Sequence, residues 1–151
     1  MTNINDLKSI VMFNNLKVSM LEKLSNITSI KTYKASDYIF NEGDDANNLY
    51  AVIEGRVRLE IDKKYTTRIS INDIIQGMVF GFSALVETEK KSYTTYAQAR
   101  TDVKLYKWQA TDLEALFNQD FEMGFLFMKE IAKIVKARLQ IRNIQFLDIY
   151  K

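Results

Sequence analysis

Apolar residues at helical spacing open the chain. From residue 4 to residue 27 they recur every three or four positions, which is the period of one face of an α-helix. The residues that carry this pattern are Leu7, Ile10, Val11, Leu16, Met20, Leu21 and Leu24. The pattern breaks near Asn14 and Asn15, so the sequence predicts two short helices in this segment.

A block of short strands is predicted between residues 49 and 108. Leu49 to Ile53 is an apolar run, and Arg56 to Asp62 alternates between charged and apolar residues. Such alternation is typical of a strand with one face in the core, so Glu60 is expected on the solvent face. Further strands are expected at Thr66–Ile71, Ser92–Ala99 and Val103–Trp108. Many short strands at close spacing favour a sandwich, barrel or roll.

The C-terminal quarter of the chain is predicted to be helical. Thr111 and Glu114 have the spacing of a capping box, in which each side chain caps the backbone amide of the other. One long helix is then expected from Phe121 to about Asp148.

Two apolar stripes follow this long helix. The first advances by alternating steps of four and three residues, as a coiled-coil seam requires. Its members are Met128, Ala132, Val135, Leu139, the polar Arg142, and Phe146. The second stripe lies on a neighbouring face and comprises Phe127, Ile131, Ile134 and Ile141. One stripe can pack on the strands, which leaves the other for a partner, so the sequence predicts a homodimer through this helix.

The composition excludes several classes of function. The chain has 151 residues, about the length of one domain, and a net charge of +2, which does not indicate nucleic acid or membrane binding. It contains no Cys and no His, so thiolate chemistry and the commonest general base and metal ligand are absent. We therefore expect no enzymatic activity, no metal site and no cofactor.

The chain also lacks membrane and export signals. No apolar run approaches the length needed to cross a bilayer, and residues 1–16 lack the basic start of a signal peptide. A cytoplasmic protein without a membrane partner is expected.

Four of the five glycines lie in recognisable motifs. Residues 39–44 read I-F-N-E-G-D, residues 49–57 read L-Y-A-V-I-E-G-R-V, and residues 76–85 read Q-G-M-V-F-G-F-S-A-L. These resemble the I-x-x-E-G-D turn, the Y-x-I-x-x-G-x-V hairpin and the P-G-D-x-F-G-E-x-A-L phosphate-binding cassette of the CRP/FNR-type cyclic-nucleotide-binding domain family. Residues 13–24 are similar to the opening helical motif of that family, and residues 138–148 resemble its dimerisation helix and hinge.

The resemblance implies a mainly β fold with flanking helices. The expected core is a double-stranded β-helix, that is a jelly-roll-like β-roll, with short N-terminal helices and a long C-terminal dimerisation helix. Residues 1–120 would form the roll with its N-terminal helices, and residues 121–151 the long helix of the same domain. In CRP-type regulators a helix-turn-helix domain follows, so DNA is expected as a partner only if such a domain is missing from this chain.

The resemblance also places a candidate ligand site at the cassette, residues 76–85. The family pairs the cyclic phosphate with an Arg and the ribose with a Glu. Here Phe82 stands at the Glu position, and Tyr93, or Ser92 under a one-residue shift, stands at the Arg position. The helix positions that would contact adenine hold Arg142 and Asn143. The candidate ligand-binding residues are Gly81, Phe82, Ser83, Ala84, Tyr93, Thr94 and Thr95.

Three interpretations of this site stay open. The favoured one is a transcription-regulator-type sensor domain whose pocket is degenerate and filled by Phe82 and Tyr93. The second is a true cyclic-nucleotide or small-anion sensor with unusual contacts, in which Lys90 or Lys91 supplies the missing cation. The third is a protein-interaction module with a vestigial pocket. Arg138 and the other basic residues of the long helix are expected on a solvated face.

Overall fold

Three short helical segments, rather than two, precede the strands. The computed structural model describes residues 2–63 and 67–149. Helix α1 (Ile4–Leu7) begins after Asn3, whose side chain accepts a hydrogen bond from the Asn5 amide at 2.8 Å. A 3-10 turn, η1 (Val11–Phe13), and helix α2 (Val18–Asn26) follow. The predicted break near Asn14 thus separates η1 from α2.

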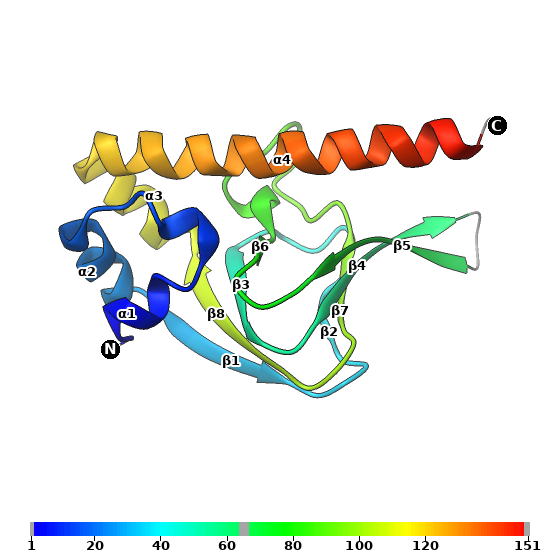
Figure 1. Ribbon diagram of the computed structural model, residues 1–151, viewed down its shortest axis with the longest axis horizontal. Coiled ribbons are helices and arrows are strands. Elements are labelled where there is room, and N and C mark those ends of the chain that lie inside the picture. Colours follow the sequence, from blue (N-terminus) through cyan, green and yellow to red (C-terminus); the bar gives the residue numbers. More distant parts are fainter. Residues whose placement is uncertain (1, 64–66, 150–151) are drawn as a thin grey trace.

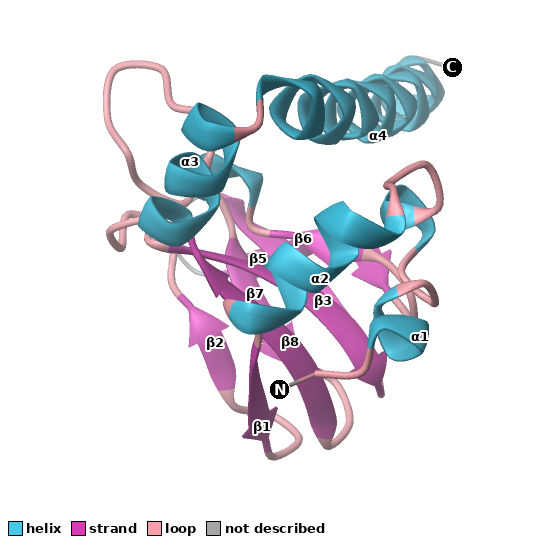
Figure 2. Ribbon diagram, turned by 90° about the vertical axis from the view of Figure 1, so that its left-hand side faces the viewer, coloured by secondary structure: helices cyan, strands magenta, loops and turns pink. Residues whose placement is uncertain are grey.

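Two four-stranded antiparallel sheets face each other and form the β-roll (Figures 1 and 2). The first sheet has the order β1 (Ser29–Tyr33), β8 (Val103–Gln109), β3 (Asn48–Glu54) and β6 (Val79–Phe80). The second has the order β2 (Tyr38–Phe40), β7 (Tyr96–Ala99), β4 (Val57–Lys63) and β5 (Thr67–Ile74). The mainly β roll with flanking helices is therefore confirmed.

Two details of the predicted strands are wrong. The pairing of β4 with β5 shifts after Leu59, because Ile71 is an extra residue in β5 and the register passes from Leu59–Asn72 to Glu60–Ser70. Glu60 lies between its register partners Ser70 on β5 and Tyr96 on β7, and it is buried instead of solvated. The segment predicted as a strand from Ser92 becomes regular only at Tyr96, because the backbone of residues 91–93 hydrogen-bonds instead to the turn at residues 43–46. Thr66, the predicted start of β5, lies outside the described residues.

Two C-terminal helices close the fold. Helix α3 (Ala110–Gln119) begins one residue before Thr111, and no side chain caps it. The predicted capping box is therefore wrong, because Thr111 already lies within the helix. Helix α4 (Phe121–Ile149) follows at once, and the Asp120 carboxylate accepts the Met123 amide at 3.0 Å. This bond is the principal cause that lowers the pKa of Asp120.

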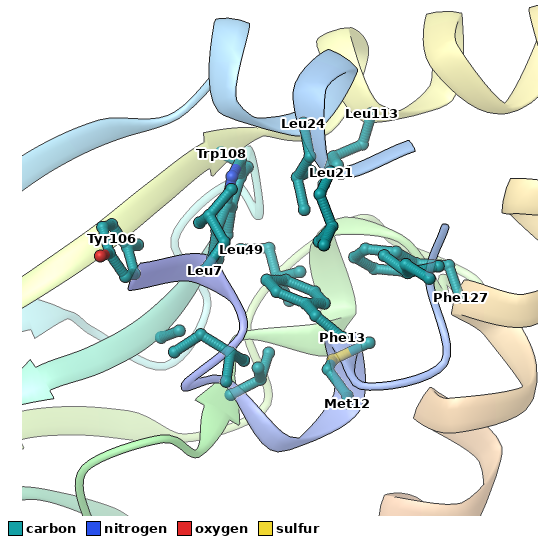
Figure 3. Packing of buried hydrophobic residues seen from close by; sticks show 14 of the residues in the cluster. Leu7, Met12, Phe13, Leu21, Leu24, Leu49, Tyr106, Trp108, Leu113 and Phe127 are labelled. Atoms are coloured by element: carbon teal, nitrogen blue, oxygen red, sulfur yellow. The ribbon is translucent and has the colours of Figure 1, made fainter. Parts of the chain in front are cut away.

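The hydrophobic core has two connected parts. One lies within the β-roll, and the other packs the N-terminal helices, α3 and the first half of α4 against the first sheet (Figure 3). In the second part, the Phe13 and Trp108 rings pack in a T-shaped arrangement at a centroid distance of 5.4 Å. The Trp108 indole N–H donates to the Thr28 hydroxyl at 2.6 Å, so this buried polar atom is satisfied.

Helix α4 runs along one side of the roll, above β6 and the turn that follows it (Figure 1). Its first half is anchored by the buried side chains of Met123, Phe127 and Ile131. In the second half of α4 the predicted second apolar stripe is no longer buried, since Ile141 is 50% exposed. Within the described ranges, no helix is long and apolar enough to cross a membrane.

Gly55 is expected to be a far more sensitive position than Gly43. Both have φ of +90°, so alanine at either position adopts a left-handed conformation that costs about 1–2 kcal/mol. A Cβ at Gly55 would collide with the Asp102 carbonyl oxygen and lie 2.8 Å from Val103 Cγ1, whereas at Gly43 it meets nothing within 4 Å. Overpacking adds about 1–3 kcal/mol at Gly55 alone.

Urea unfolding measures the difference directly. Gly55→Ala is expected to lower the free energy of unfolding by about 2–5 kcal/mol, and Gly43→Ala by about 1–2 kcal/mol. Equal losses in the two variants would contradict the close packing of the β3–β4 turn against residues 101–103.

Candidate ligand-binding site

The cassette turns back over the first sheet at Gly81. This residue has φ of +89° and is followed by the short 3-10 helix η2 (Phe82–Ala84). A Cβ added at Gly81 would lie 3.1 Å from the Asn48 carbonyl oxygen and 3.6 Å from the Tyr93 ring. Glycine is therefore required both by the backbone conformation and by the close approach of β3.

Tyr93 lies beneath this turn as part of the core. Its ring stacks on Phe40 at a centroid distance of 3.6 Å, and its hydroxyl donates to the Asn48 carbonyl at 2.6 Å. The same hydroxyl accepts the Asn48 amide at 3.2 Å. Burial is the main cause that raises the pKa of Tyr93 to about 12. Tyr93 thus stays neutral and uses its polar atom on the backbone of β3.

Arg138 reaches the cassette from the opposite side. Its Nη2 donates to the Val79 carbonyl at 2.7 Å, and its guanidinium lies 5.1 Å from the centroid of the Phe82 ring. Burial first, and then the charge of Arg142, lower the pKa of Arg138 to about 10. The side chain of Arg138 therefore points under α4 into the protein, and its predicted place on a solvated face is wrong.

A cavity of about 320 Å³ lies between the cassette, the second sheet and α4. Its floor and cassette side are lined by Phe40, Leu59, Ile71, Asn72, Gly81, Phe82, Ser83, Tyr93, Thr94 and Thr95. Its roof is formed by four side chains of α4, namely Val135, Arg138, Leu139 and Arg142. A cavity of this size, mostly apolar with a few converging polar groups, has the make-up of a small-molecule site.

Six of the seven candidate ligand-binding residues line this cavity. They are Gly81, Phe82, Ser83, Tyr93, Thr94 and Thr95. Ala84 does not, because its side chain is fully buried in the core. The rings of Phe82 and Tyr93 occupy part of the site but leave the cavity above them open.

Lys90 and Lys91, the cations predicted as replacements for the family's Arg, do not reach the cavity. Lys91 lies 3.4 Å from the Glu114 carboxylate, and neither Lys90 nor Lys91 lines the cavity. Arg138 was missed because the helical pattern does not show which basic residues turn inward. Among the residues that the structure describes, no group of three or more acidic side chains is placed to hold a metal ion.

The sequence matches the cyclic nucleotide-binding domain family over residues 30–120, and the chain belongs to that family. A curated relative, the Global nitrogen regulator of Nostoc sp., is 22% identical over 121 residues, which are 80% of this chain and 54% of that protein. The chain thus spans about half the length of the nitrogen regulators it matches.

Solved structures share the same fold. A protein of Geobacter metallireducens, assigned as cyclic-nucleotide-binding, is 26% identical with a TM-score of 0.79, covering 92% of this chain and 99% of its own. The catabolite activator protein of Thermus thermophilus is 23% identical with a TM-score of 0.74, covering 92% of this chain and 62% of its own. The chain is therefore a cyclic nucleotide-binding domain that resembles the regulatory domains of transcription regulators.

Proposed function

We propose that the chain is a non-catalytic sensor domain in which occupation of the cavity under α4 sets the position of that helix. The observation that carries this proposal is a shared set of side chains. Val135, Leu139 and Arg142 line the cavity and also belong to the predicted dimer seam of α4. A ligand that pushes on the roof of the cavity would therefore change the surface through which α4 meets a partner.

The partner in this proposal is a second copy of the chain. In this proposal the seam extends beyond the six predicted residues, because Phe121 and Phe125 precede Met128 with the same steps of four and three residues and Ile149 follows Phe146. Phe121 is 79% exposed and Phe125 is 65% exposed. A 3.5-residue period kept along the whole of α4 fits another long helix better than a flat surface or a groove. The 29 residues of α4 give a seam of about 43 Å.

The proposal also concerns the ligand of the cavity and the kind of protein to which the domain belongs. The cavity replaces the family's Glu and Arg with Phe82 and Tyr93, so it takes a ligand other than a cyclic nucleotide. The chain acts as the sensor part of a transcription regulator or as a protein derived from one. DNA becomes a partner only through a further domain.

Filling the cavity without a ligand tests the link between cavity and helix. Thr95 is half-buried and lines the cavity, so Thr95→Trp is expected to push α4 outward and weaken dimerisation by about tenfold. The dimer dissociation constant is measured by sedimentation equilibrium, and hydrogen exchange of residues 135–142 reports the helix. Thr32→Trp, on the exposed face of β1, is the matched control. An unchanged dissociation constant in folded Thr95→Trp would contradict the proposal.

A further inference from the structure

The cavity under α4 carries an uncompensated positive charge. Arg138 and Arg142 both line it, and none of the residues that line it is Asp or Glu. Within residues 2–63 and 67–149, the structure records no carboxylate within salt-bridge distance of either guanidinium. Two guanidinium groups therefore face one partly enclosed space in which no described residue supplies a counter-charge.

Arg138 is half-buried, so part of its side chain is removed from water. A guanidinium carries five N–H groups, and the Val79 carbonyl is its recorded acceptor in the described part of the chain. Burial and the neighbouring Arg142 both disfavour the charged form of Arg138, and both lower its pKa. The contact with the Phe82 ring holds the guanidinium plane beside the cassette and leaves its other N–H groups for a ligand.

We propose that Arg138 and Arg142 form an anion site in the roof of the cavity, which binds the carboxylate or phosphate group of a small ligand. This inference deepens the proposed function and rests on it. Guanidinium groups bind such oxyanions through paired N–H donors, and they do so most strongly where water is excluded.

The rest of the cavity defines the remainder of the ligand. The Ser83, Thr94 and Thr95 hydroxyls lie on the cassette side, and the side chains of Phe40, Leu59 and Ile71 supply apolar walls. A volume of about 320 Å³ is at the lower end of the range for small-molecule sites. The ligand class is therefore a small, compact molecule with one anionic group and an apolar or neutral body. The charge that the family places on the cassette side comes here from α4.

Matched probes with and without charge test this site. Phenyl phosphate, phenylacetate and inorganic phosphate are titrated against the full chain at constant ionic strength, with phenol as the neutral control. Saturable increases in melting temperature are expected with the anionic probes and not with phenol. Each shift is measured against the melting temperature of the same variant without probe, so that a change in basal stability does not enter.

Substitutions of the two arginines test whether their side chains supply the positive charge that binds the anion. Arg138→Gln and Arg142→Gln are each expected to weaken anion binding by about tenfold to a hundredfold, and the double variant to abolish it. Arg100→Gln, which removes an exposed arginine away from the cavity, is the control and should bind like the wild type. If Arg138→Gln fails to fold, Arg142→Gln, at an exposed position, tests the site on its own.

Several outcomes would overturn the anion site. One is a wild-type protein that gives no saturable shift with any anionic probe, and another is anion binding that survives in the Arg138→Gln/Arg142→Gln variant. Phenol binding as tightly as the anions would also overturn it while leaving a ligand cavity in place. The proposed function fails separately, through an unchanged dimer affinity in Thr95→Trp.

Discussion

Glutamate at both Val135 and Leu139 is expected to convert a dimer into a monomer at about 10 µM protein. In the single chain these side chains are 49% and 57% exposed, and they occupy successive positions of the α4 seam. The double substitution places four carboxylates in the interface of a symmetric dimer. Burying them without partners costs on the order of 4 kcal/mol or more, which is about a thousandfold in the dissociation constant.

Sedimentation velocity gives the measurement, and a second pair of glutamates gives the control. Ala137 and Gln140 are exposed and lie off the seam, so Ala137→Glu/Gln140→Glu adds the same charge without entering the interface. This control should remain dimeric. A wild-type protein that sediments as a monomer at tens of micromolar, or a seam variant that remains a dimer, would show that α4 does not join two copies.

The seam and the cavity are thermodynamically linked in this scheme. Arg142 occupies a seam position between Leu139 and Phe146 and also lines the cavity. The symmetric dimer has two cavities, so the factor by which full occupation changes the dimer affinity must equal the product of the changes in ligand affinity at the two cavities when the dimer forms. Ligand binding measured at two protein concentrations, below and above the dimer dissociation constant, therefore reports the coupling without a structure of the complex.

The sequence predicts the fold well because its turns and periods are local properties. The left-handed glycines at positions 43, 55, 77 and 81 set the turns of the roll, and the apolar period of α4 spans its whole length. The errors occur where tertiary contacts overrule a local pattern. Glu60 is buried between β5 and β7 although the alternation of its strand predicts a solvated position, and α3 begins at Ala110 although Thr111 and Glu114 have capping-box spacing.

The candidate site is predicted only in part, for a similar reason. Motif position alone locates Gly81, Phe82 and Ser83, because the cassette is continuous in the sequence. The roof of the cavity comes from α4, which is far from the cassette in the sequence. Arg138 lies 59 residues from the Val79 carbonyl that it contacts, and in a helix rich in Lys and Arg nothing local distinguishes it from a solvated side chain. Its inward direction follows only from the way α4 rests on the roll.

Neither cyclic AMP nor cyclic GMP is expected to bind with a dissociation constant tighter than about 0.1 mM. The Phe82 side chain has no acceptor for the ribose hydroxyl. The Tyr93 side chain carries no charge to meet the cyclic phosphate, and its hydroxyl already donates to the Asn48 carbonyl. Two lost charged hydrogen-bond partners, at about 1.5–3 kcal/mol each, cost at least a hundredfold in affinity.

The arginines of α4 are not expected to restore nucleotide binding, because they come from a different element than the family's Arg. Arg138 meets the cassette at the Val79 carbonyl and the Phe82 ring, and Tyr93 leaves the position of the family's Arg uncharged. Placing Arg at position 93 would not help either. It would break both hydrogen bonds to Asn48 and bury a cation in the core of the roll.

Calorimetric titration of the wild-type protein with both nucleotides, at about 0.15 M salt, measures this expectation. Phenyl phosphate in the same buffer is the positive control, because the proposed anion site is expected to bind it. Phe82→Glu, at a half-buried position, restores the ribose acceptor alone and is expected to gain no nucleotide binding. The uncharged Tyr93 still stands where the family has its Arg, and the new carboxylate lies beside the Arg138 guanidinium and competes with the phosphate for it. A dissociation constant near or below micromolar for the wild type would contradict the degenerate pocket. Loss of that binding in Arg138→Gln would then identify the α4 roof as the phosphate site of an unusual cyclic-nucleotide sensor.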